Sequence, residues 1–197
     1  MKKNNVLKKI GVFGGSFDPV HCGHVAVAKS FIQNVGLDLL YVVPTCVSPL
    51  KNALTAPAQD RVNMLKIAFA DTEKAVISDI ELRREGVSYT CETVAQLRGK
   101  HPKSRIYYLI GDDWLAGFTR WKDYGYILQN VRLTVANRSG RDLSAEAREF
   151  YRLTGKRPLM LKNEVNVVSS CSFRENRDFS LRPPAVSDYI KERGLYE

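Results

Sequence analysis

The sequence predicts an α/β fold: a Rossmann-like, doubly wound parallel sheet with helices on both faces and a small C-terminal helical part. Short apolar runs alternate with segments of helical apolar spacing along the whole chain. The apolar runs are nearly continuous, which is typical of strands that are buried on both faces. Unusual sequences follow three of them, at Gly14–Ser16, Gly111–Asp113 and Ser169-Ser170. In a parallel sheet such strand ends share one edge, where ligands bind.

The first half of the chain begins with a predicted buried strand over 6–13, VLKKIGVF, which ends at the backbone break of Gly14-Gly15. Apolar side chains then recur at helical spacing over 21–35. The run 39–43 is rich in β-forming residues and is closed by Pro44. The same two signals predict a helix over 58–70 and a strand over 75–78.

The second half continues the alternation. Residues 105–110, RIYYLI, give the clearest strand signal and end at Gly111. A helix over 89–98 precedes them, with Ser88 or Thr90 as its predicted N-cap. The remaining predicted elements are helical turns through Leu128, a strand over 132–136, an amphipathic helix over 144–153, strands over 158–161 and 165–168, and a last helix after Pro183-Pro184.

Size and composition favour a single domain over residues 1–197, with its C-terminal helical part from about residue 170. No apolar run approaches the roughly 18 to 20 residues that span a bilayer. The basic start leads directly into the first strand, so we interpret it as a charged tail and not as a signal peptide. The 4 cysteines form no C-x-x-C pair, which favours free thiols in a reducing cytoplasm.

The net charge of +9 favours anionic partners. Lys and Arg are spread over the whole chain, so charge alone does not distinguish small phosphates from nucleic acid or a membrane surface.

The stretch GGSFDPVHCGH, residues 14–24, predicts a phosphate site. Gly14 and Gly15 allow a ligand to approach the backbone and permit a positive φ. His21 and His24 share one face of a helix start, where free N–H groups and the helix dipole attract anions. The stretch is neither a P-loop nor a G-x-G-x-x-G motif. A zinc site with Cys22 is disfavoured because no carboxylate completes the ligand set, so no metal-binding residues are assigned.

This stretch resembles the H-x-G-H signature of the nucleotidyltransferase superfamily. Four further segments, in order and spacing, resemble those of bacterial nicotinate-nucleotide adenylyltransferases over nearly the whole chain. They are DIELRREGVSYTCETVAQL (79–97), YYLIGDDWLAGFTRW (107–121), VSSCSFR (168–174) and PPAVSDYIKERGLY (183–196).

The resemblance implies a role for each candidate residue. An indole such as Trp121 is a sensible partner for an electron-poor pyridine ring, and Asp112 at a strand end could accept ribose hydroxyls. Structural alternatives stay open: a core tryptophan, a turn-forming aspartate, surface cations, and a simple helix start at Tyr89. The implied catalytic residues are His21, His24, Lys51 and Arg174. Those implied for ATP are Gly14, Gly15, Ser16, Phe17, Asp112, Ser169 and Ser170, and those for the nicotinate nucleotide are Tyr89, Thr90 and Trp121.

Two positions depart from the family pattern. Cys171 replaces the usual threonine, and a thiol is a poor hydrogen-bond donor. The loop SPLKN keeps Lys51 but lacks the histidine that usually precedes it. Both departures bear on how the triphosphate and the pyridine are contacted.

The implied reaction is adenylyl transfer from ATP to nicotinate mononucleotide, which gives nicotinate adenine dinucleotide and pyrophosphate in NAD biosynthesis. Mg²⁺ is expected to arrive with ATP. We expect no nucleic-acid or membrane partner, while the residues leave a homo-oligomer and the choice between nicotinate and nicotinamide open. The alternatives are a pantetheine-phosphate adenylyltransferase or cytidylyltransferase on the same fold, and a basic nucleotide- or RNA-binding module without catalysis.

Overall fold

A computed structural model describes residues 8–47, 54–162 and 182–196. Within them, a 6-stranded sheet has the order β3-β2-β1-β4-β5-β6, and every neighbouring pair of strands is parallel. The order reverses between β1 and β4, which is the switch point where doubly wound sheets bind ligands. The strands are β1 (Lys9–Gly15), β2 (Leu39–Pro44), β3 (Ala75–Ile77), β4 (Arg105–Gly111), β5 (Arg132–Ala136) and β6 (Leu159–Leu161).

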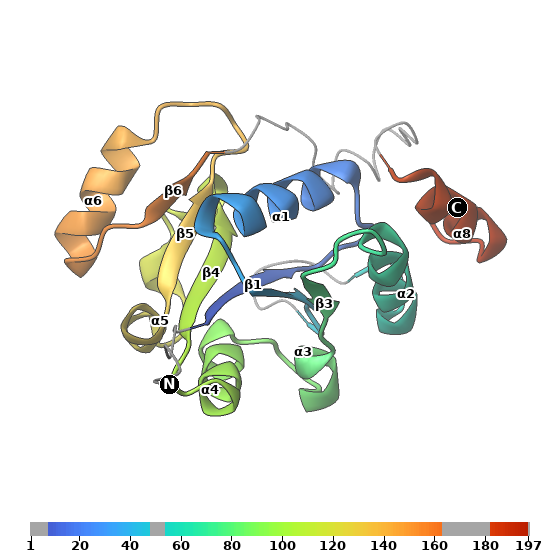
Figure 1. The fold of residues 1–197 in the computed structure, drawn as a ribbon, viewed down its shortest axis with the longest axis horizontal. Helices are drawn as coiled ribbons and strands as arrows, with labels where there is room; N and C mark the ends of the chain where they lie inside the picture. The colour runs from blue at the N-terminus through green and yellow to red at the C-terminus, as the bar shows by residue number, and fades with distance from the viewer. Residues whose placement is uncertain (1–7, 48–53, 163–181, 197) are drawn as a thin grey trace, which may run out of the picture.

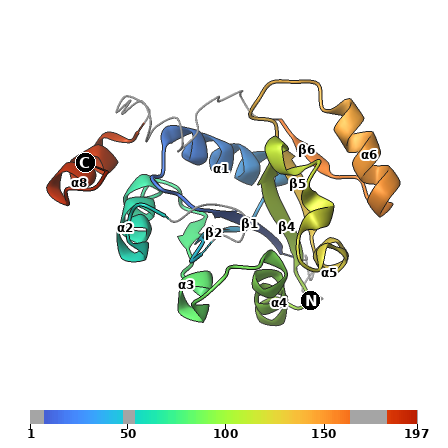
Figure 2. The same ribbon diagram turned by 180° about the vertical axis from the view of Figure 1, so that it is seen from behind.

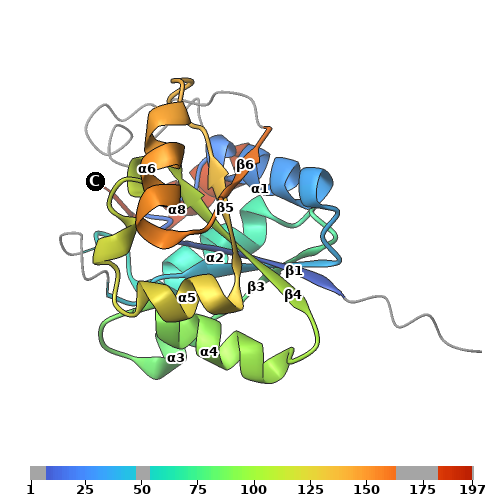
Figure 3. The ribbon, with the colours of Figure 1, turned by 90° about the vertical axis from the view of Figure 1, so that its left-hand side faces the viewer.

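Helices cover both faces of this sheet, with α1 over one face and α3 and α4 under the other (Figures 1 and 2). The side view of Figure 3 shows β1 and β4 between α1 and α4. The helices are α1 (Cys22–Val35), α2 (Ala58–Ala68), α3 (Ile80–Arg84), α4 (Thr90–Lys100), α5 (Tyr124–Asn130), α6 (Ser144–Thr154) and α8 (Pro184–Glu192), with the single turns η1 (Asp112–Trp114) and η2 (Phe118–Arg120).

Alternating side chains of the four central strands, β2, β1, β4 and β5, enter two separate cores, as the two-residue period of a strand requires. On β4, Tyr107 and Leu109 join the core that α1, α2 and α8 cover. Ile106, Tyr108 and Ile110 join the opposite core, which receives side chains from α4, α5 and α6. The predicted doubly wound α/β fold is therefore confirmed.

The structure differs from the sequence-based expectation in three places. β1 continues through Gly14 and Gly15, because both pair in register with the end of β2. The five-residue helix α3 was not predicted, since it is too short to show a helical period. The N-cap of α4 is Tyr89, and neither Ser88 nor Thr90 caps it. The expected strand over 165–168 lies outside the described residues.

The C-terminal helix α8 packs beside α2 (Figure 1). Its buried side chains Val186 and Ile190 belong to the same core as α1 and α2. Among the described residues, no helix is long and apolar enough to cross a membrane.

Candidate active site

The backbone that leaves β1, here called the β1 turn (residues 14–21), lies at the switch point of the sheet. Its left-handed residue is Phe17, with φ 48°, whereas Gly14 and Gly15, which permit a positive φ, do not adopt one. A Cβ on Gly14 would lie 2.7 Å from the Tyr108 hydroxyl, and one on Gly15 would lie 3.1 Å from the Phe17 ring. Both glycines are therefore needed for close packing and not for an unusual φ.

The two predicted histidines meet at the start of α1. His21 is the N-cap residue, in extended conformation, and its backbone N–H donates to Nδ1 of His24 at 3.2 Å. The two imidazoles stack with centroids 3.6 Å apart at 24°. The ring of Phe17 meets that of His24 edge-on, with centroids 5.0 Å apart. The β1 turn and the helix start thus present both imidazoles side by side.

The environment of His21 keeps its imidazole neutral. The residue is only 2% exposed. Its side chain faces the backbone N–H of His24 in a capping box, and neither ring nitrogen has a hydrogen-bond partner elsewhere among the described residues. Burial, and then the charge of Arg138, lower the pKa of His21 to about 4. Buried polar atoms are normally hydrogen-bonded, so unpartnered imidazole nitrogens at a helix N-terminus indicate a site that a ligand completes.

Asp112, at the end of β4, holds the loop that follows β5. Its carboxylate accepts the backbone N–H groups of Arg138 at 3.3 Å and Ser139 at 3.2 Å, and the Ser139 hydroxyl. Burial raises the pKa of Asp112, but the bonds from Ser139 and Arg138 outweigh it and leave the pKa below its usual value. Asp112 therefore stays ionised and fixes the backbone of Arg138.

Arg138 lies beside His21, and the sequence analysis did not select it. Its charge acts on the imidazole of His21, and its Cδ would lie 3.5 Å from a Cβ on Gly111. It follows β5 by two residues. The rule that selected the ends of the other strands could have found it.

The residues expected at the pyridine nucleotide lie together on the face of the sheet opposite α1. The hydroxyls of Thr90 and Tyr108 are 3.3 Å apart, and Trp121 meets the Tyr108 ring edge-on, with centroids 6.4 Å apart. The indole N–H of Trp121 is buried without a partner among the described residues. Nζ of Lys122 lies 4.1 Å from the centroid of the Tyr89 ring. The structure thus brings Tyr89, Thr90 and Trp121 into one aromatic, partly polar region.

Tyr108 lies between the β1 turn and the region around Trp121. The sequence analysis did not select it, because a tyrosine within a buried strand is typical of a core residue. Its hydroxyl faces Gly14 on one side and Thr90 on the other. Burial, followed by the negative charge of Glu81, raises the pKa of Tyr108. The phenol therefore remains protonated and can donate a hydrogen bond.

Four predicted site residues lie outside the described residues: Lys51, Ser169, Ser170 and Arg174. Cys171 does too. Within the described residues, no group of three or more His, Cys, Asp or Glu side chains could hold a metal ion.

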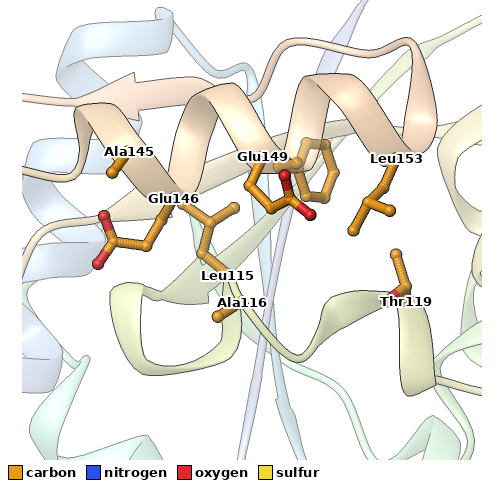
Figure 4. A pocket seen from close by; sticks show the side chains of 8 residues that line it. Leu115, Ala116, Thr119, Ala145, Glu146, Glu149 and Leu153 are labelled. Carbon is orange, nitrogen blue, oxygen red and sulfur yellow. The ribbon is translucent and has the colours of Figure 1, made fainter.

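A separate hollow of about 270 Å³ lies between α6 and the turns that follow β4. Figure 4 shows side chains of α6 facing those of the turns across it. Its acidic residues, Glu146 and Glu149, disfavour a polyphosphate there. None of the predicted site residues lines it; the lining side chains are those of Leu115, Ala116, Thr119, Ala145, Glu146, Glu149, Phe150 and Leu153.

Comparison with known proteins identifies the family of the chain. The cytidylyltransferase-like family model matches residues 12–176, so the chain belongs to that family of nucleotidyltransferases. A probable nicotinate-nucleotide adenylyltransferase of Neisseria meningitidis serogroup A is 36% identical over 97% of this chain and 100% of the relative. One of Aquifex aeolicus is 43% identical over 66% of this chain and 77% of the relative. Within the wider family, the chain belongs to the nicotinate-nucleotide adenylyltransferases.

The fold has a solved counterpart. A nicotinic acid mononucleotide adenylyltransferase of Plasmodium falciparum, complexed with NaAD, superimposes with a TM-score of 0.79. The alignment covers 96% of this chain and 97% of that one at 20% sequence identity. At that identity the likeness concerns the arrangement of strands and helices.

Proposed function

We propose that the switch-point site carries out the reaction of the family, adenylyl transfer from ATP to nicotinate mononucleotide. The observation that carries this proposal is the stacked pair of His21 and His24 at the start of α1, with unpartnered imidazole nitrogens on His21. Neutral imidazole N–H groups and a helix N-terminus suit a triphosphate that already carries its own charge. Products of the reaction are nicotinate adenine dinucleotide and pyrophosphate.

The donor half of the site is assigned to the β1 turn and its surroundings. His21 and His24 would donate to the phosphates of ATP, and Arg138 would add a positive charge beside them. Asp112 acts by holding the Arg138 backbone, and its proposed contact to a ribose hydroxyl uses a carboxylate that stays ionised. The remaining proposed ATP contacts come from Gly14, Gly15, Ser16, Phe17, Ser169 and Ser170, and the remaining catalytic charges from Lys51 and Arg174.

The acceptor half is assigned to the region around Trp121. Stacking of an electron-poor pyridine on the indole or on Tyr89 is favourable. Thr90 and the protonated Tyr108 phenol supply hydroxyls for the nucleotide. Because Tyr108 borders both halves, it would fix the separation between the acceptor phosphate and the α-phosphorus of ATP.

The proposed chemistry needs no covalent nucleophile and no general base. The 5′-phosphate of the acceptor is already an anion, and its attack on the α-phosphorus forms the new P–O bond while pyrophosphate leaves. Catalysis then consists of alignment and of stabilising the charge that develops in the transition state. Mg²⁺ is proposed to enter with ATP, held by phosphates and water.

A cytoplasmic location is proposed from the free thiols of Cys22, Cys46 and Cys91.

The decisive experiment measures pyrophosphate release with ATP or CTP against a panel of acceptor phosphates. We expect release with ATP and nicotinate mononucleotide, and much less with CTP. Preferred turnover of pantetheine phosphate, or of CTP, would overturn the proposal in favour of the alternative acceptors. Salt-sensitive RNA binding without any pyrophosphate release would indicate a non-catalytic RNA-binding module instead.

A further inference from the structure

A phenol from the C-terminal segment reaches the β1 turn. The Tyr196 hydroxyl donates to Oδ1 of Asp18 at 2.6 Å, across 178 positions of sequence. Asp18 is 1% exposed and directly follows Phe17 in the turn. Asp18 therefore places a buried carboxylate within the β1 turn, which forms the proposed triphosphate site. Because a buried carboxylate needs hydrogen-bond partners, those partners determine where the turn lies.

Two further donors to Asp18 come from the segment that leads into α2. The backbone N–H of Thr55 donates to Oδ2 at 2.7 Å, and that of Ala56 donates to Oδ1 at 3.0 Å. Bonds to an ionised acceptor are stronger than neutral ones. The turn is thus fastened from two distant parts of the chain at a single carboxylate.

A buried arginine holds the same turn at Ser16, two residues before Asp18. Arg61 of α2 is 1% exposed, and its Nη1 donates to the carbonyl oxygen of Ser16 at 2.8 Å. Burial lowers the pKa of Arg61, and the neighbouring charge of Asp18 opposes that shift. Ser16 and Asp18 are therefore both held from outside the turn, and Phe17 lies between them.

The position of the turn is transmitted to the histidines through Phe17. Its ring packs edge-on against His24 at 5.0 Å, and His24 stacks on His21 at 3.6 Å. Because these rings are in direct contact, a shift of Asp18 displaces the imidazoles. A displacement of about 1 Å at a reacting geometry can lower turnover by about 10²-fold.

We propose that Tyr196 is a positioning residue for the adenylyl-transfer reaction, which acts through Asp18 and Phe17 on His24. This inference rests on the proposed function of the histidine pair. It assigns the C-terminal segment a part in catalysis in addition to its packing on α2.

The same segment offers a matched control in Tyr189. Its hydroxyl donates to Oδ1 of Asp60 at 2.7 Å and accepts from Asn63 at 2.9 Å. Asp60 lies on α2, outside the β1 turn. Tyr189→Phe and Tyr196→Phe therefore each remove one phenol that is bonded to a buried carboxylate, but only the second bond is made to the turn.

The test compares kcat, KM for both substrates and Tm in the two variants. Each should lose about 2–4 °C of Tm per hydrogen bond removed in a chain of this size, so Tyr189→Phe, which removes two bonds, should lose at least as much as Tyr196→Phe. Tyr196→Phe should lower kcat by about 10-fold, which is less than the 10²-fold loss expected for a displacement of about 1 Å. The KM for nicotinate mononucleotide should change little. Tyr189→Phe should keep the wild-type kcat. Equal kcat losses in both variants, or none in either, would overturn the proposal.

A second readout does not depend on activity. The chain has 3 histidines, so their ring C–H signals can be assigned in NMR spectra. Tyr196→Phe should shift the signals of His21 and His24 and leave that of His101 in place, whereas Tyr189→Phe should shift none. Unmoved His21 and His24 signals in Tyr196→Phe would reject the positioning role. A wild-type protein without pyrophosphate release would reject the proposed function instead, and the NMR comparison would still test the positioning.

Discussion

At the scale of single residues, the two imidazoles of the site differ because their surroundings differ. His21 is buried with a pKa lowered to about 4, while His24 is half-buried and lies between Phe17 and His21. His24 is therefore the better placed of the two to meet a ligand from solvent, and His21 to support it.

His24→Ala should lower kcat by about 10²-fold, the usual effect of removing one transition-state donor. Circular dichroism should remain native, because the side chain is not part of the closed core. Lys29→Ala, at an exposed position on the same helix, is the control and should keep wild-type turnover. Unchanged kcat in the His24 variant would remove this imidazole from the chemistry.

The pKa of His21 predicts a pH dependence of stability. Its folded-state pKa of about 4 lies below the ordinary value of 6.5, so the unfolded chain binds more protons between these values. Stability should therefore be fully present above about pH 6.5 and fall as the pH decreases towards 4, by about 2 kcal/mol at pH 5. Urea unfolding of wild type and His21→Gln at several pH values measures this. The fall in the free energy of unfolding that His21 causes between about pH 6.5 and pH 4 should be absent in the variant. Equal slopes in both proteins would contradict the shifted pKa.

At the scale of elements, the site depends on how closely β1 and β4 pack. A Cβ on Gly14 would lie 2.7 Å from the Tyr108 hydroxyl, which is closer than real Cβ contacts. Gly14→Ala should therefore destabilise the fold by about 1–3 kcal/mol, as overpacking does, and raise KM for the acceptor. Adding Tyr108→Phe removes the obstructing oxygen and should restore most of the lost stability. Strict additivity of the two changes in chemical denaturation would show that this contact is not the cause.

Local patterns predicted the elements well where the signal itself is local. The apolar run over β4 and the helical spacing over α1 were read correctly, and both predicted histidines lie at one helix start. The strand-end rule could have selected Arg138, but its place beside His21 could not be predicted, because it depends on how the loop after β5 folds back onto Asp112. The bond from Tyr196 to Asp18 is a still clearer case, since nothing local relates residues that far apart. The roles of Lys51, Ser169, Ser170 and Arg174 stay predictions.

At the scale of the whole molecule, the C-terminal helix α8 shares a core with α1 and α2. Ile190 of α8 is 3% exposed and belongs to the cluster that contains Phe31 of α1 and Leu65 of α2. The expected single domain of 1–197 therefore predicts that α8 unfolds together with the sheet.

Ile190→Ala should lower the free energy of unfolding by about 2–5 kcal/mol, the range for large-to-small changes in a core. Unfolding followed by tryptophan fluorescence, which reports on Trp114 and Trp121 across the sheet, should coincide with unfolding followed by circular dichroism. Val76→Ala, at a position that is 45% exposed on β3, is the control and should have a small effect. An early separate transition in the Ile190 variant would show that α8 is an independent unit.

The placement of the Tyr108 phenol between Gly14 and Thr90 has a thermodynamic consequence. In the proposed site this one side chain forms part of the boundary of both nucleotide compartments, so occupancy of either compartment should change the surroundings of the other. Free-energy conservation around a binding cycle then requires that ATP alters the affinity for the acceptor by the same factor as the acceptor alters the affinity for ATP. Removing the phenol oxygen would therefore reduce the effect of ATP on acceptor affinity and the effect of the acceptor on ATP affinity by the same factor, even though this oxygen faces the two proposed compartments on opposite sides.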